Sequence, residues 1–119
     1  MGLFDKFRKK ETTQPDYSGI DSMDKAHKAA DQGILAPLYM MPLRFNGEDS
    51  ARNMLFVPPF VVEWKDRYDD MVEDLLLQEK VSSYSCTPEY KGNSFIPARL
   101  VIKAGKDGTD VFTETINIW

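Results

Sequence analysis

The sequence is poor in the side chains on which most enzymes depend at neutral pH. Its 119 residues include one histidine, His27, and one cysteine, Cys86. Zinc needs several nitrogen and sulfur ligands, so the composition excludes a zinc site, and we expect neither a metal nor a cofactor. One cysteine cannot form a disulfide within the chain, and nothing in the composition therefore indicates an oxidising compartment.

Motifs that bind phosphate or activate a nucleophile are missing as well. No glycine-rich loop has the spacing or the lysine of a phosphate cradle, and no serine lies in a Gly-x-Ser-x-Gly context. His27 falls on the apolar side of a predicted helix and Cys86 in a predicted strand, where such residues are more often structural than catalytic. These absences favour binding over catalysis. The many Asp and Glu residues leave a carboxylate-dependent enzyme as an alternative.

Long apolar segments and strong positive charge are also lacking. No run approaches the roughly 18 apolar residues of a membrane span, and the first ten residues have neither the apolar segment nor the cleavage site of a signal peptide. We therefore expect a cytoplasmic protein. The net charge of -4 argues against a nucleic-acid partner. A hydrophobic fraction of 42% over this length is typical of one folded domain.

Composition divides the chain into a basic head with a flexible linker over residues 1–20 and a single α+β domain over residues 21–119. The head combines Leu3, Phe4 and Phe7 with four cationic side chains, Lys6, Arg8, Lys9 and Lys10. Residues 11–20 are polar, contain Pro15 and Gly19, and show no periodicity. Such a head can form a short amphipathic turn that lies on an anionic membrane. Its membrane contact would be weak, because only three apolar side chains are present. A peripheral membrane adaptor is therefore the second hypothesis.

Periodicity within the domain predicts two helices and several strands. A short helix is expected after a cap at Asp21 or Ser22 and ends at Gly33. A long amphipathic helix is expected from Phe60 to about Lys80. Its apolar positions predict one wide buried stripe: Val61, Trp64, Tyr68, Met71, Val72, Leu75 and Leu76. Strands are expected over 38–45, 53–57, 81–86, 96–104 and 109–119. Pro88 and the run over residues 91–94 are expected to break the third strand, and the fourth alternates in the pattern of a half-buried strand. A turn over residues 105–108 is expected to join the last two strands into a hairpin.

This order of elements predicts an α+β fold. It consists of an antiparallel sheet of about four to five strands, with one long amphipathic helix and one shorter N-terminal helix packed on it. A parallel sheet would need more helical crossovers than the chain supplies.

Two features of the domain are candidate contact surfaces. The long helix carries carboxylates on the side opposite Trp64 and Leu75: Glu63, Asp66, Asp70 and Glu73. A row of carboxylates on a helix is most often a face exposed to solvent. The alternatives are a surface that binds a basic partner and a site that binds a hard cation. The second candidate is the loop over residues 88–97, where Tyr90, Asn93 and Phe95 form a stiff aromatic platform or close one end of the core.

The sequence therefore predicts a non-catalytic protein-binding module. Many small, acidic α+β proteins of bacteria are adaptor or immunity-type proteins, and this chain resembles them in size, charge and predicted fold class. Its partner is expected to be another protein, with a basic surface if the acidic helix face makes the contact. The oligomeric state is left open.

Overall fold

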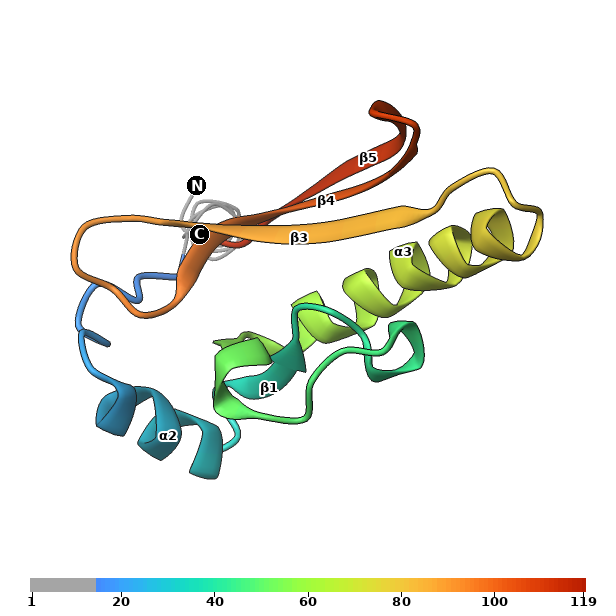
Figure 1. Ribbon diagram of the computed structural model, residues 1–119. Helices are drawn as coiled ribbons and strands as arrows, with labels where there is room; N and C mark the ends of the chain where they lie inside the picture. The colour runs from blue at the N-terminus through green and yellow to red at the C-terminus, as the bar shows by residue number, and fades with distance from the viewer. Residues whose placement is uncertain (1–14) are drawn as a thin grey trace, which may run out of the picture.

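The structure is a computed structural model that describes residues 15–119, so the predicted basic head lies outside the described part. Figure 1 shows the arrangement of its helices and strands. The elements are α2 (Met23–Asp31), β1 (Ala36–Tyr39), β2 (Met54–Val57), α3 (Pro59–Leu77), β3 (Ser83–Tyr90), β4 (Pro97–Lys106) and β5 (Thr109–Asn117). Short 3-10 turns lie at Leu43–Phe45 and Ala51–Asn53.

The α+β class is confirmed, but the strands form two antiparallel sheets and not one. β1 pairs with β2, and β3, β4 and β5 form a three-stranded sheet in that order. The β1–β2 hairpin does not extend the larger sheet, because it packs face-on against it. Leu38 and Val57 of the hairpin share one buried cluster with Leu100 and Ile102 of β4. In Figure 1 the three-stranded sheet forms one layer, and the hairpin and α3 together form a second layer against one side of that sheet.

The three-stranded sheet follows the predicted alternation, with one extension. β4 buries Leu100, Ile102 and Ala104 and exposes Arg99 and Lys103. β4 and β5 are joined by a tight turn in which Asp107 and Gly108 both have positive φ, as a type I′ hairpin requires. The prediction that Pro88 breaks the third strand is wrong. β3 continues to Tyr90, because β3 is an edge strand and a proline there removes no ladder hydrogen bond.

The predicted strand over 38–45 is also corrected, since β1 ends at Tyr39 and the chain turns at Pro42. The following segment is held by the buried side chain of Asn53. Its amide nitrogen donates to the carbonyl oxygens of Met41 and Glu48, and its amide oxygen accepts from the Met41 N–H. These bonds replace the ladder that a longer strand would have provided.

The short helix α2 begins and ends as predicted. The Ser22 side chain accepts a hydrogen bond from the Lys25 N–H, and Gly33 has a φ of 77° just beyond the helix. Its buried side is made by Ala26 and Ala29. His27 is a correction: it is exposed, and its ring lies against Phe56 at a centroid distance of 4.8 Å.

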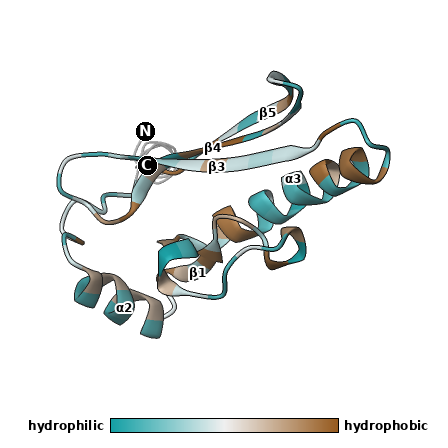
Figure 2. Cartoon of the chain, in the orientation of Figure 1, coloured by the Kyte–Doolittle hydropathy of each residue, from teal (hydrophilic) through white to brown (hydrophobic). Residues whose placement is uncertain are grey.

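The predicted stripe of the long helix is only partly buried. The buried residues of α3 are Val61, Lys65, Asp69 and Val72. Trp64, Met71 and Leu76, which the periodicity assigned to the core, are exposed. The inner face of α3 therefore differs from the predicted one. The ion pair of Lys65 and Asp69 occupies its centre, where the periodicity predicted aromatic side chains. Figure 2 shows polar residues through the middle of α3 and hydrophobic ones at its last turn.

Residues 15–20, which the sequence assigned to a linker, pack against the domain. The ring of Tyr17 contacts that of Trp119 edge-on at 5.8 Å. The Ser94 hydroxyl donates to the Tyr17 carbonyl at 2.7 Å, and the Phe95 N–H donates to the Ile20 carbonyl at 2.8 Å. This segment therefore supports the loop between β3 and β4.

The position of the core is tested by a matched pair of leucine substitutions. Leu100 is fully buried in β4, whereas Leu77 is 75% exposed at the end of α3. Leu100→Ala should lower the free energy of unfolding by about 2–5 kcal/mol, because it leaves a cavity. Leu77→Ala should change it by less than about 0.5 kcal/mol. Urea unfolding followed by tryptophan fluorescence measures both, and equal losses would contradict this core.

Candidate functional site

An ion pair is buried between α3 and β3. The Lys65 Nζ lies 2.6 Å from Asp69 Oδ2, and the two side chains are only 2% and 6% exposed. The Tyr84 hydroxyl donates to the other carboxylate oxygen at 2.6 Å. The Lys65 ammonium also lies 5.5 Å from the centre of the Tyr84 ring. The carboxylate of Asp69 is thus shared by a cation on its own helix and a hydroxyl on the sheet.

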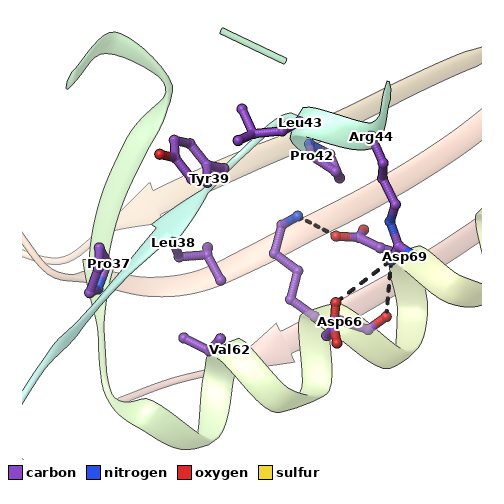
Figure 3. Close-up of a pocket in the computed structure, with 10 residues that line it drawn as sticks. Pro37, Leu38, Tyr39, Pro42, Leu43, Arg44, Val62, Asp66 and Asp69 are labelled. Atoms are coloured by element: carbon purple, nitrogen blue, oxygen red, sulfur yellow. Dashed lines mark hydrogen bonds and ion pairs between the residues drawn. The ribbon is translucent and has the colours of Figure 1, made fainter. Parts of the chain in front are cut away.

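A pocket of about 300 Å³ opens beside this ion pair, between β1, the turn at Pro42 and α3. Its apolar lining includes Leu38, Leu43 and Val62, and Lys65, Asp66 and Asp69 line it from α3. Figure 3 shows the labelled Arg44 reaching from the turn towards the carboxylates of the helix. The pocket is therefore apolar on the hairpin side and charged on the helix side.

The four acidic residues predicted as a contact surface lie together on α3, and each has an arginine partner. Arg44 lies 2.7 Å from Asp70, 3.4 Å from Glu73 and 3.7 Å from Asp66. Arg67 lies 2.9 Å from Glu63. Sequence reasoning missed Arg44, because the turn that carries it was expected to be a strand. The two guanidinium groups halve the charge of the four carboxylates, which weakens this surface as an attractor of basic partners.

The two titratable side chains of β3 near the ion pair, Tyr84 and Cys86, are kept in their protonated forms. Burial is the main cause that raises the pKa of Tyr84, and the hydrogen bond to Asp69 raises it further. Burial likewise raises the pKa of the Cys86 thiol to about 11. A thiol with that pKa is a poor nucleophile at neutral pH. Both oxygens of Asp69 already accept hydrogen bonds, so this carboxylate is not free to act as a general base.

A second and larger hollow lies between α2, the β1–β2 hairpin region and the loop that follows β3. It has a volume of about 430 Å³ and is lined by Met23 and Ala26 of α2, Met40, Arg52, Met54, Leu55 and Phe56 of the hairpin region, and Tyr90, Ser94 and Phe95. We call it the methionine groove. Tyr90 and Phe95 are 50% and 44% exposed at its edge. The structure thus brings two of the three predicted loop residues to the groove, while the exposed Asn93 does not line it. The contribution of Met23, Met40 and Met54 was missed, because they are far apart in the sequence.

Comparisons with protein-family models, with curated proteins and with solved structures yield no match. Within residues 15–119, no helix is long and apolar enough to cross a bilayer. The same part of the chain holds no cluster of three or more histidine, cysteine or acidic side chains arranged to bind a metal ion.

The buried ion pair is tested by removing one partner and then the whole network. Lys65→Met leaves the Asp69 charge buried, so the free energy of unfolding should fall by about 3–5 kcal/mol. The triple variant Lys65→Met/Asp69→Leu/Tyr84→Phe removes every polar group of the network and should recover most of that loss. Urea unfolding compares both with wild type. A triple variant less stable than Lys65→Met would contradict this account.

Cys86 provides a test of burial by chemical reactivity. Because burial raises the pKa of its thiol from 9.0 to about 11, the thiolate fraction at neutral pH should fall about 100-fold. The reaction with a thiol-specific chromogenic reagent should therefore be at least that much slower in buffer than in denaturant. Equal rates in the two media would show that the inner face of β3 is open to solvent.

Proposed function

We propose that this protein is a non-catalytic protein-binding module and that its contact site is the methionine groove. Its occupant is a segment of another protein that presents several large apolar side chains on one face. The observation that carries the proposal is the convergence of Met23, Met40 and Met54 with the exposed rings of Tyr90 and Phe95, from three separate parts of the chain.

The composition of the groove supports an apolar partner. Methionine side chains are flexible and polarisable, so they adapt to irregular apolar surfaces and recur at binding sites that accept helices. Aromatic side chains are enriched at protein interfaces, and tyrosine is among the residues that most often dominate the binding energy. Apart from Ser94 and Arg52, the groove is lined by apolar and aromatic residues, and Arg52 already pairs with Glu48 at 2.7 Å.

The frame of the groove supports binding without a large ordering cost. The Ser94 hydroxyl donates to the carbonyl of Tyr17 and accepts from the N–H of Ile96, so the loop is fixed on both sides. The Phe95 N–H is bonded to the segment at Ile20. A rim held in place by such bonds loses little conformational entropy on binding, which strengthens association.

The other hypotheses have less support. The acidic face of α3 keeps part of its negative charge, but arginine pairing satisfies Asp70 and Glu63 at short distances. A carboxylate-dependent enzyme would need a free general base, whereas Asp69 is bonded to both Lys65 and Tyr84. The membrane-adaptor hypothesis depends on residues 1–10, outside the described part of the chain, and stays a prediction.

The proposal is tested by a photo-crosslinking amino acid placed at Phe95 in the full-length protein in cells. Because Phe95 is at the rim of the groove, we expect a discrete crosslinked partner. The control carries the same amino acid at Lys103, an exposed position on the outer face of β4. With the captured partner in hand, Phe95→Ala and Tyr90→Ala should each raise the Kd by about 10-fold or more, as expected for hot-spot aromatics.

The acidic face provides the competing outcome. The variant Asp66→Asn/Asp70→Asn/Glu73→Gln should bind that partner as wild type does at all salt concentrations. If this variant loses affinity at low ionic strength while Phe95→Ala retains it, the contact is electrostatic and lies on α3, and the groove proposal is overturned.

A further inference from the structure

The N-terminal part of the chain enters the domain at one wall of the methionine groove. The Tyr17 carbonyl accepts a hydrogen bond from the Ser94 hydroxyl at 2.7 Å, and the Ile20 carbonyl accepts one from the Phe95 N–H at 2.8 Å. Ser94 and Phe95 both line the groove. In Figure 1 the segment before α2 accordingly passes along the loop between β3 and β4. Residues 1–14, outside the described part, are therefore attached close to the groove.

The groove itself presents large apolar side chains to solvent. Met23, Tyr90 and Phe95 are between 44% and 50% exposed, and they line one hollow of about 430 Å³. A hollow of this volume takes a ligand of the size of a few side chains. Contiguous exposed apolar surface on a soluble protein is usually a binding site, so the groove is suited to a short apolar segment.

Residues 1–14 have both the side chains and the length to fill it. Leu3, Phe4 and Phe7 are large and apolar, and their spacing places them on one side of a helical turn. Phe7 precedes Tyr17 by ten residues, and ten residues span up to about 33 Å when extended. Because Tyr17 is bonded to a residue of the groove wall, this reach is enough to bring the three apolar side chains into the groove.

The charges of the two parts are opposite. Residues 1–14 carry two more cationic than anionic side chains, and residues 15–119 carry six more anionic than cationic ones. Opposite net charges attract, so the segment is drawn towards the domain. A short tether gives an effective concentration of the order of 1 mM, at which a contact with a dissociation constant of about 0.1 mM is formed about 90% of the time.

We propose that Leu3, Phe4 and Phe7 occupy the methionine groove of their own chain and that a binding partner must displace them. The displacement rests on the proposed function, because it needs a partner that uses the groove, whereas the contact itself does not. The head is then an autoinhibitory segment that covers the apolar rim of the groove in the free protein. Only a partner that binds the groove more strongly than this tethered segment replaces it.

A spin label in the head tests the contact without any partner. In the full-length Cys86→Ser protein, a nitroxide attached at Asp5→Cys should remove most of the methyl signal of the three groove methionines, Met23, Met40 and Met54. Met71, which is exposed on α3, should keep most of its signal. Groove resonances that the label leaves unaffected would overturn the proposal.

The matched control carries the same label together with Leu3→Ser/Phe4→Ser/Phe7→Ser, which keeps the tether and the charges. The groove resonances should return, and signals that stay broadened would show that the apolar side chains do not make the contact. A mixture then separates one chain from two. Isotope-labelled protein without the nitroxide, mixed with an equal amount of unlabelled protein that carries it, should show no broadening. Broadening in the mixture would assign the groove to the head of a second copy and overturn the proposal.

The displacement is tested with the partner captured at Phe95. Leu3→Ser/Phe4→Ser/Phe7→Ser should lower the Kd of that partner by about 10-fold, since a groove filled about 90% of the time is free for one tenth of it. An unchanged Kd would overturn the displacement. The two proposals fail separately. Capture at Phe95 without broadening by the head label removes only the head contact, and broadening without capture removes only the binding partner.

Discussion

The buried pairing of Lys65 with Asp69, completed by the Tyr84 hydroxyl, fixes how the other elements are arranged. Two charges at the centre of an otherwise apolar layer are tolerated only while both are paired. Because the Lys65 ammonium and the Tyr84 hydroxyl both contact one carboxylate, α3 has one rotation about its axis against β3. That rotation directs the acidic residues towards Arg44 and leaves Trp64 and Met71 facing solvent.

The sequence predicts the elements better than their faces. Gly33, the turn at Asp107 and Gly108, and the alternation in β4 follow from local backbone and burial rules, and all three are found in the structure. The faces of α3 do not follow from such rules. Hydropathy treats Trp64 as buried and Lys65 as exposed, and the reverse holds because Tyr84, distant in sequence, satisfies the charge. One feature of the sequence does indicate the buried pair. Lys65 and Asp69 are four residues apart, on the same side of the helix as the buried Val61 and Val72.

The candidate surfaces were predictable to different degrees. Tyr90 and Phe95 were predicted as contact residues because they flank a Gly-Asn turn between two prolines. Both line the methionine groove. The methionines could not be predicted as a set, since only the packing of α2 and the hairpin brings them together.

The most direct test of the groove as the contact site uses methionine methyl resonances in NMR spectra of the full-length protein. Met23, Met40 and Met54 line the groove, whereas Met71 is exposed on α3. On addition of the partner captured at Phe95, the account predicts large shifts of the three groove methyl resonances and little change at Met71. Shifts at Met71 with the groove resonances unmoved would contradict it.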